Sequence, residues 1–249
     1  MTPVVVPVGG PPEFSALVVL YGGGRVALRA LATLVAHTGV PFEVVVVDNA
    51  SADGSGALVC TLCRNAHFVP LPANVGFGPA MNMAADRARA PRLLLLNPDV
   101  QFTPGWYEPL ADALGSERVA AVSPVLLDPD GSVQEAGADI DADGFTHPRL
   151  VVPTGPAVVE YASAACLLVS RDAFGEVGGF DPAFVPAYFE DADLAMRWSE
   201  IGRDVVVHPG SRVLHDRGGG GGGARALAAA QRNHARFRER WAARLAEKR

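Results

Sequence analysis

Two acidic stretches of the sequence combine residue types that could do chemistry. Asn97-Pro98-Asp99 follows the run Leu93-Leu94-Leu95-Leu96, and Glu190-Asp191 opens a segment with helical periodicity. Oxygen-bearing side chains such as those of Asn97 and Asp99 suit hard divalent cations, Mg²⁺ or Mn²⁺, which proteins commonly share with substrate phosphates. A turn that merely ends a strand uses the same residues. The first stretch alone therefore leaves both interpretations open.

The Glu190-Asp191 pair is a candidate for proton transfer. On a helix, these two side chains project close to the edges of the apolar face that contains Leu194 and Trp198, whereas Asp193 lies round the side. Acids in the first turn also stabilise a helix, by ~0.3–1 kcal/mol, but this explains their position along the helix and not their direction. Because burial raises the pKa of a carboxyl group, an inward acid suits a general base. We favour the catalytic interpretation.

Apolar strands and amphipathic helices alternate in the first half of the chain. The strands are expected at residues 14–21, 42–47, 67–71 and 92–96, and the helices at residues 25–39, 80–89 and 103–114. Strand–helix–strand units of this length build a parallel sheet, and such sheets bind ligands at the carboxyl ends of their strands. Asp48 falls at such an end, as do Asn97 and Asp99. Gly76 and Gly78, just before a helix, would let the backbone approach a phosphate.

The second half of the chain has a weaker pattern. Strands are expected at residues 119–125, 161–169, 205–208 and 212–215, with a hairpin turn at Pro129-Asp130-Gly131. Residues 137–156 are polar and proline-bearing, without clear periodicity, and we expect a long loop that shapes an acceptor pocket. The glycine run at residues 218–223 is expected to be mobile.

Length and composition favour one large α/β domain or two fused half-domains, since the chain has 249 residues, of which 49% are hydrophobic. No apolar run approaches the ~18–20 residues that span a bilayer, and residues 1–12 do not resemble a signal peptide; we expect a loose extension there. Three cysteines argue against a disulfide framework and for a reducing compartment. Cys60 and Cys63 are expected to be small core residues.

Charge is unevenly distributed along the chain. Residues 225–249 hold eight Lys/Arg and two Glu, a net charge of +6, whereas the whole chain carries −6. Four arginines recur every fourth residue, at Arg232, Arg236, Arg240 and Arg244. This stripe is typical of either a solvated helix face or a surface for an anionic partner such as a membrane. Nucleic acid is not expected as a partner, because no binding motif accompanies the stripe.

Six motifs follow one another in an order that resembles family 2 glycosyltransferases, and most of all their rhamnosyltransferase-like branch. They span roughly residues 14 to 216 and are Asp48-Asn49-Ala50-Ser51-Ala52-Asp53-Gly54-Ser55, Asn74-Val75-Gly76-Phe77, Leu95-Leu96-Asn97-Pro98-Asp99, Ala165-Cys166-Leu167-Leu168, Gly178-Gly179-Phe180-Asp181 and Tyr188-Phe189-Glu190-Asp191-Ala192-Asp193-Leu194. The resemblance implies an α/β GT-A fold, a Rossmann-like and mostly parallel sheet flanked by helices, with a small acceptor-side subdomain and a C-terminal helix. It also implies inverting, metal-dependent sugar transfer from a nucleotide sugar to an acceptor hydroxyl.

The resemblance also assigns roles by position. It implies Asp191 as the general base with Glu190 beside it, and a Mg²⁺ or Mn²⁺ site at Asp99, His215 and Asn97. The implied nucleotide-sugar contacts are Tyr21, Asp48, Asn74, Gly76, Phe77, Asn97 and Asp99, and the implied acceptor-side residues are Ala164, Ala165 and Tyr188. The chain departs from the family at Leu20-Tyr21-Gly22, where many relatives have Asn-Tyr-Asn, and at Ala164, where glycine is usual.

Domain boundaries, partners and location follow as expectations. Residues 1–13 would be an N-terminal extension, residues 14–223 one domain with a nucleotide-binding half (14–100) and an acceptor half (101–223), and residues 224–249 a basic helix. The donor would be a nucleoside-diphosphate sugar, dTDP- or UDP-linked, with a deoxysugar such as rhamnose favoured. The acceptor would be a glycan, a lipid-linked sugar or a small molecule. A cytoplasmic enzyme is expected, with peripheral contact with the inner membrane face and a homodimer both left open.

Two rival functions remain at this point. A sugar-nucleotide pyrophosphorylase also has a glycine-rich, arginine-bearing loop after its first strand, as in Gly22-Gly23-Gly24-Arg25. Such enzymes resemble one another in gripping phosphates with lysines, and Lys248 is the single lysine of this chain. The other rival is a nucleotide-sugar-binding protein without turnover. The joint presence of Asp99, Asp191 and His215 argues against it.

Overall fold

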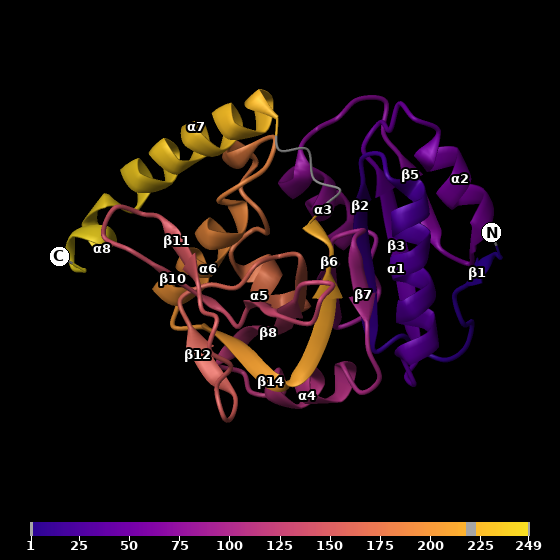
Figure 1. The fold of residues 1–249 in the computed structure, drawn as a ribbon, viewed down its shortest axis with the longest axis horizontal. Helices are drawn as coiled ribbons and strands as arrows, with labels where there is room; N and C mark the ends of the chain where they lie inside the picture. Colours follow the sequence, from indigo (N-terminus) through magenta and orange to yellow (C-terminus); the bar gives the residue numbers. More distant parts are fainter. Residues whose placement is uncertain (1, 218–222, 249) are drawn as a thin grey trace.

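Residues 2–217 and 223–248 are described in the computed structural model, in which helices lie on both sides of a large central sheet (Figure 1). In the first half the elements are β1 (Val4–Val5), β2 (Phe14–Leu20), α1 (Gly24–His37), β3 (Phe42–Asp48), α2 (Ser55–Leu62), β4 (Cys63–Arg64), β5 (His67–Pro70), α3 (Phe77–Ala85), β6 (Arg92–Leu96) and β7 (Val100–Phe102). In the second half they are α4 (Tyr107–Ala113), β8 (Val119–Leu127), β9 (Val133–Glu135), β10 (Ala138–Ile140), β11 (Thr146–Pro148), β12 (Ala157–Val159), β13 (Cys166–Ser170), α5 (Arg171–Glu176), the 3₁₀ helix η1 (Pro182–Phe184), α6 (Glu190–Glu200), β14 (Asp204–His215), α7 (Ala224–Arg240) and α8 (Ala242–Ala246).

The large sheet has the order β12-β14-β8-β13-β6-β2-β3-β5, with β7 paired to β14 and β9 paired to β8. From β6 to β5 all neighbours are parallel, as the strand–helix–strand pattern predicts. The second half is mixed, because β13 lies antiparallel to both β6 and β8. Leu95 pairs with Leu17 on one side and with Leu167 on the other, so the leucine strand is central. Its carboxyl end therefore meets both halves of the chain.

Alternate side chains of the central strands build two hydrophobic layers. Leu93 and Leu95 pack with residues of α3, α5 and α6 on one face of the sheet. Leu94 and Leu96 pack with residues of α1 and α4 on the other face. Successive side chains of a strand point to opposite faces, so four consecutive leucines are what a strand buried on both faces requires.

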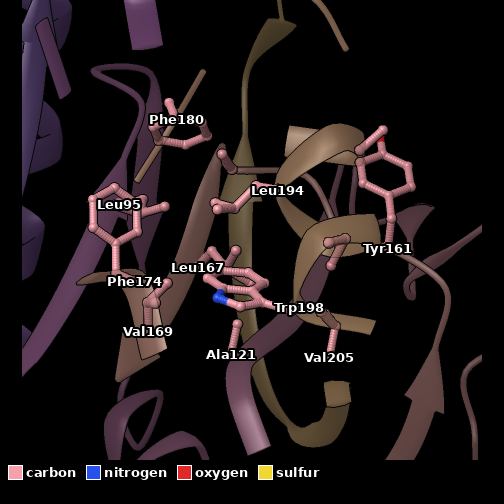
Figure 2. Close-up of a cluster of buried hydrophobic side chains, with 14 of the residues drawn as sticks. Leu95, Ala121, Tyr161, Leu167, Val169, Phe174, Phe180, Leu194, Trp198 and Val205 are labelled. Atoms are coloured by element: carbon pink, nitrogen blue, oxygen red, sulfur yellow. The ribbon is translucent and has the colours of Figure 1, made fainter. Parts of the chain in front are cut away.

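Helix α6, which begins with the acidic pair, is fixed to the sheet by its apolar face. Figure 2 shows Trp198 between Leu167 and Val205, with Leu194 beside it. The indole N–H of Trp198 donates to the carbonyl of Ala173 at 2.8 Å, so its polar edge is satisfied. Burying large apolar side chains such as these contributes about 1.5–3 kcal/mol each. The packing holds the first turn of α6 at the carboxyl end of the central strands.

Several expected boundaries are wrong. The helix expected at residues 80–89 runs from Phe77 to Ala85, and the strand expected at residues 161–169 begins at Cys166. Helix α4 begins at Tyr107 and not at residue 103, because the Thr103 hydroxyl donates to the Arg212 carbonyl and does not cap a helix. Residues 137–156 are not one loop, since β10 and β11 pair as an antiparallel hairpin within them. The two expected strands at residues 205–208 and 212–215 form one strand, β14, with an irregularity between them.

The N-terminal segment and the cysteine pair also differ from expectation. Val4 and Val5 pair in parallel with Cys63 and Arg64, and the side chain of Val4 is buried, so this part of the extension is not loose. Cys63 is buried as expected, whereas Cys60 is exposed. The glycine run lies outside the described residues, apart from Gly223.

The basic stripe of α7 and α8 makes contacts with the rest of the protein. Arg232 and Arg236 donate to the carbonyls of Val185 and Ala183, in the segment that leads to α6. Arg240 pairs with Asp181 and Asp193, and Arg244 pairs with Glu200 and Glu247. Figure 1 shows α7 and α8 lying across the side of the molecule that carries α6. These contacts attach the helix to the rest of the chain, while the four arginines remain exposed.

Candidate active site

One cavity of about 460 Å³ collects most of the residues singled out in the sequence. Its lining consists of Phe77, Asn97, Asp99, Thr146, Tyr161, Ser163, Ala164, Ala165, Ala187, Tyr188, Phe189, Glu190, Asp191, His215, Arg217 and Ala230. The cation-binding candidates and the proton-transfer candidates, about ninety residues apart in the chain, thus share one cleft. This juxtaposition is the geometric requirement for a reaction that needs both.

Asp99 and His215 approach each other at the floor of the cavity, with Nε2 of His215 3.3 Å from Oδ1 of Asp99. Nδ1 of His215 lies 2.6 Å from Oε1 of Gln134. The Gln134 amide nitrogen donates to Oδ1 of Asp128 and to the carbonyl of His215, so its oxygen must face the ring. Nδ1 is therefore the protonated ring nitrogen. In the neutral imidazole, the lone pair of Nε2 then points at the carboxylate.

This arrangement fits a divalent cation. Oδ1 of Asp99 is buried and has no hydrogen-bond partner in the described part of the chain, and a buried carboxylate oxygen without a partner is costly. Two electron-rich atoms that face each other are the donor set that Mn²⁺ or Mg²⁺ would satisfy, with Asn97 alongside. Within residues 2–217 and 223–248, no group of three or more His, Cys, Asp or Glu could hold a metal by itself. Further ligands would have to come from Asn97, water or substrate oxygens.

Glu190 and Asp191 form an acidic pair that also lines the cavity. Burial, together with the charge of Asp191, raises the pKa of Glu190 well above its ordinary value. Burial also raises the pKa of Asp191, but backbone N–H groups oppose this rise. Its Oδ2 accepts from the Ala164 N–H at 3.3 Å and its Oδ1 from the Ala192 N–H at 2.9 Å. Burial therefore favours the neutral form of Glu190, while the two N–H groups favour the charged form of Asp191.

The backbone before α6 aims these two carboxyl groups. Tyr188 and Phe189 both have positive φ angles, 80° and 68°. This left-handed conformation is costly for side chains of this size and persists only where surrounding contacts impose it. Asp193 is fully buried, and its carboxylate accepts hydrogen bonds from Arg197, Arg240 and the Trp241 indole. Asp193 is thus a structural anchor of α6.

Glu135 is a further buried acid close to the pair, and sequence patterns did not indicate it. Burial raises the pKa of Glu135 to about 7, against the lowering effect of the Ser163 N–H that it accepts at 2.8 Å. The negative charge of Asp191 raises this pKa further. Since Glu135 takes the N–H of Ser163 and Asp191 takes that of Ala164, two acids hold consecutive amides of the acceptor-side wall. No sequence motif indicated three further residues that line the cavity, Ser163, Thr146 and Tyr161.

The remaining nucleotide-site candidates lie outside the cavity lining. Tyr21 is 66% exposed at the end of β2, and Asp48 accepts the Ser51 N–H at the end of β3. Asn74 accepts hydrogen bonds from the Gly76 N–H and from Asn49. Their strands end at the same edge of the sheet as β6, so Tyr21, Asp48 and Asn74 flank the cavity without entering it.

Gly76 has a structural reason to be glycine. Its φ is +94°, and a Cβ there would stand 2.8 Å from a Val185 methyl group. Buried Asn49, which no pattern singled out, donates to the Gly76 carbonyl and accepts from the Val75 N–H, and so fixes this loop. The next residue, Phe77, is the first residue of α3 and does line the cavity.

Comparison with known proteins decides the family. The family model described as "Glycosyl transferase family 2" matches residues 15–178. The chain belongs to glycosyltransferase family 2. It is 34% identical over 227 residues to an N-acetylglucosaminyl-diphospho-decaprenol L-rhamnosyltransferase of Mycobacterium tuberculosis, covering 79% of this chain and 74% of that protein. It is also 30% identical over 225 residues to the O-antigen biosynthesis protein RfbC of Myxococcus xanthus, covering 84% of this chain but 18% of that protein.

Solved structures confirm the GT-A fold of this family 2 glycosyltransferase. GalNAc-T7, solved with UDP, GalNAc and Mn²⁺, superposes with a TM-score of 0.74 at 18% identity, over 92% of this chain and 48% of that one. The mannosyltransferase PcManGT of Pyrobaculum calidifontis, in complex with GDP-Man and Mn²⁺, superposes with a TM-score of 0.66 at 19% identity, over 94% of this chain and 64% of that one. The family 2 chain thus spans about half of the first neighbour and nearly two thirds of the second.

Because the chain belongs to family 2, its glycine-rich loop at residues 22–25 no longer supports a sugar-nucleotide pyrophosphorylase as a rival function. Of the described helices of this glycosyltransferase, none is long and apolar enough to cross a membrane.

Proposed function

We propose that this family 2 glycosyltransferase moves a deoxysugar, with rhamnose favoured, from a nucleoside-diphosphate donor to an acceptor hydroxyl with inversion of the anomeric carbon. The observation that carries the proposal is the single cavity shared by Asp99, His215, Glu190 and Asp191. The sugar is inferred from the mycobacterial relative, which is named as an L-rhamnosyltransferase. We accordingly favour a dTDP-sugar over a UDP-sugar as donor.

In this proposal residues 14–100 bind the nucleotide and residues 101–223 the acceptor. Asp48 and Tyr21, at the ends of neighbouring strands, would contact the nucleoside, with the 74–77 loop beneath it. Asp99 and His215, with Asn97, would hold Mg²⁺ or Mn²⁺ against the donor diphosphate. When bound, the cation neutralises charge on the diphosphate as it leaves. Arg217, which is 63% exposed at the cavity, adds a positive charge of the chain's own on that side.

Asp191 would act as the general base. Its carboxylate takes the proton of the acceptor hydroxyl while the acceptor oxygen forms a bond to the anomeric carbon and the bond from that carbon to the diphosphate oxygen breaks. One displacement from the opposite face inverts the configuration, and no enzyme nucleophile is required. Glu190, which holds a proton beside it, keeps a second negative charge away from Asp191. The resulting nucleoside diphosphate and the protonated Asp191 balance the reaction.

The acceptor wall would consist of Ala164, Ala165 and Tyr188. The relative's name identifies its acceptor as an N-acetylglucosaminyl diphosphate carried on decaprenol, and we propose an acceptor of this lipid-linked class here. Exposed Tyr188 is suited to pack against a sugar ring at the mouth of the cavity. Such an acceptor would bring a cytoplasmic enzyme to the inner membrane face, where the exposed arginines of the C-terminal helix could contact anionic lipid headgroups.

The test is a transfer assay with purified full-length protein. A dTDP-deoxysugar and a UDP-sugar are each incubated with an N-acetylglucosaminyl-diphospho-polyprenol, with Mg²⁺, with Mn²⁺ or with EDTA, and products are identified by mass spectrometry. We expect transfer from the dTDP-sugar, dependent on metal, with inverted linkage by NMR. A protein that binds the donors but neither transfers nor hydrolyses them under any condition would be a non-catalytic binding protein.

A further inference from the structure

A single asparagine of the C-terminal helix reaches the turn that carries the acidic pair. Asn233 lies on α7, well beyond residue 178, where the family match ends. Its side chain is fully buried. Its amide nitrogen lies 2.7, 2.8 and 3.2 Å from the carbonyl oxygens of Phe184, Ala187 and Tyr188, so its two N–H bonds serve three acceptors and one of them is shared. One polar side chain thus collects three main-chain oxygens from the five residues that precede Phe189.

The chemistry of this position favours an amide. The three carbonyls are acceptors, so they need a donor, and a carboxylate or an aliphatic side chain of similar size offers none. Buried carbonyl groups outside regular structure cost free energy when they lack a partner. Oδ1 of Asn233 is itself buried and has no hydrogen-bond partner in the part of the chain that the structure describes. The buried oxygen of Asn233 therefore costs free energy, whereas its nitrogen provides hydrogen bonds to the carbonyl groups of the turn.

The turn needs such support because its backbone is strained. Tyr188 and Phe189 both adopt left-handed φ angles immediately before α6. Asn233 holds the Tyr188 carbonyl, on the first of these two residues. Without that contact, both residues are free to relax to negative φ, which would rotate the following peptide planes and the first turn of α6.

The hydrogen bonds of the acidic pair come from the main chain. Oε2 of Glu190 is buried and lacks a partner among the described residues, and backbone N–H groups at Tyr188 and Glu190 bond the Glu190 carboxyl. Asp191 accepts from the Ala164 N–H at Oδ2, at 3.3 Å, and from the Ala192 N–H at Oδ1, at 2.9 Å. The direction of both carboxyl groups thus depends on the backbone that enters α6. That backbone is what Asn233 holds.

We propose that Asn233 is a positioning residue, whose amide holds the 184–188 turn so that Glu190 and Asp191 face the cleft. This inference rests on the proposed function in so far as Asp191 is the base. Through Asn233, helix α7 takes part in the active site. The arginine contacts of the same helix do not give it this role, because they attach the helix but do not reach the Tyr188 carbonyl.

The test compares two variants of the full-length protein. Asn233→Leu keeps the volume and removes the donors. Leu245→Ala, in α8, removes a buried side chain away from the turn and serves as a control for weaker docking of the C-terminal helices. Hydrogen exchange, measured by mass spectrometry, reports on residues 185–191 whether or not the enzyme turns over. We expect exchange there to be at least about tenfold faster in Asn233→Leu and unchanged in Leu245→Ala.

Kinetics then separate positioning from stability. For Asn233→Leu we expect kcat to fall about 10²-fold, because small displacements of a catalytic group have large effects, with the KM for the donor unchanged. Asn233→Gln, which keeps the amide, should recover part of kcat. The inference is overturned if Asn233→Leu and Leu245→Ala lose kcat equally, or if exchange at residues 185–191 is the same in all variants. Hydrogen exchange could differ between the wild type and Asn233→Leu as expected while the wild type transfers no sugar. That result would overturn the proposed function and leave the structural role of Asn233 standing.

Discussion

Nε2 of His215 and Oδ1 of Asp99 lie 3.3 Å apart, on a pair of antiparallel neighbours in the sheet: His215 pairs with Val100, the residue after Asp99. The last residue of β14 is thereby delivered to the end of the central leucine strand. Gln134, on β9, fixes the ring so that Nε2 faces the carboxylate. The juxtaposition of these two candidate cation ligands therefore follows from strand register.

The first prediction concerns this cation site. The nucleoside diphosphate is supplied at about 100 times its dissociation constant in the presence of Mn²⁺. Nucleotide with Mn²⁺ should then raise the melting temperature of the wild type by about 5–10 °C more than nucleotide alone, and EDTA should abolish this metal-dependent increment. Asp99→Asn should lose the metal-dependent increment and keep the fold. Asp204→Asn removes a carboxylate that pairs with exposed Arg118 far from the cavity lining, and should behave as the wild type. An unchanged increment in Asp99→Asn would place the metal elsewhere.

The second prediction concerns the general base. Asp191→Asn should lower kcat by about 10²–10⁴-fold, because the amide cannot take the acceptor proton. Nucleotide binding with Mn²⁺, measured by calorimetry, should stay close to that of the wild type, since Asp191 is not among the candidate cation ligands. Equal loss of binding and of transfer would assign Asp191 a structural role.

The third prediction separates Glu190 from Asp191. Burial raises the pKa of Glu190 well above its ordinary value and so favours the protonated, neutral form of this side chain. Glu190→Gln copies this neutral state, and its kcat should remain within about tenfold of the wild type. Because the neutral state is kept, the acid limb of the pH–rate profile should stay where it is in the wild type. A loss as large as that of Asp191→Asn would instead make Glu190 the base.

The fourth prediction concerns the pH dependence of stability at Glu135. Its folded pKa, about 7, lies above its ordinary value of 4.5. The unfolded chain therefore releases this proton first, and the contribution of Glu135 to stability falls as pH rises from about 4.5 to about 7. Asp191 raises this pKa, whereas the Ser163 N–H, His215 and Arg217 lower it.

Glu135→Gln keeps an acceptor for the Ser163 N–H and removes the titration. Relative to the wild type, the variant should gain at most about 3 kcal/mol in free energy of unfolding between about pH 4 and pH 8. Urea unfolding at both pH values measures this difference. A constant offset between the two proteins across the range would show that Glu135 titrates normally.

The fifth prediction concerns the anchor of α6. Asp193 is fully buried between Arg197, Arg240 and Trp241. Asp193→Ala should lower the free energy of unfolding by about 3–5 kcal/mol, because it leaves buried positive charge without its partner. Asp204→Ala, which breaks the exposed pair with Arg118, should cost no more than about 1 kcal/mol. Similar losses in both variants would contradict the structural role of Asp193.

The sequence predicted the parts of the site that stand at the ends of strongly patterned elements. Leu93 to Leu96 could only be a doubly buried strand, and so Asn97 and Asp99 had to lie at the carboxyl edge of the sheet. The periodicity of Leu194 and Trp198 likewise oriented Glu190 and Asp191. Family resemblance supplied His215, whose own segment shows little beyond a short apolar run.

The residues that escaped prediction belong to short or exposed-looking segments. Strands β9, β10 and β11 have three residues each, too few for a periodic signal, so Gln134, Glu135 and the 137–156 hairpin carried no pattern. Asn233 stands among alanines and arginines, where the repeated charge directed attention to the surface. The signal that could have found it is its poor helix propensity in a run of strong helix formers. Its three partners, almost fifty residues away, are visible only in three dimensions.

The amide of Phe77, at the start of α3, donates to the carbonyl of Pro186 at 2.7 Å, beside the tight contact of Gly76 with Val185. Nucleotide-side and acceptor-side segments are therefore joined through their main chains at the rim of the cavity. A chimera that combines the first half of this enzyme with the second half of a relative must reproduce these main-chain contacts. Without them, the exchange of specificity would damage both binding sites.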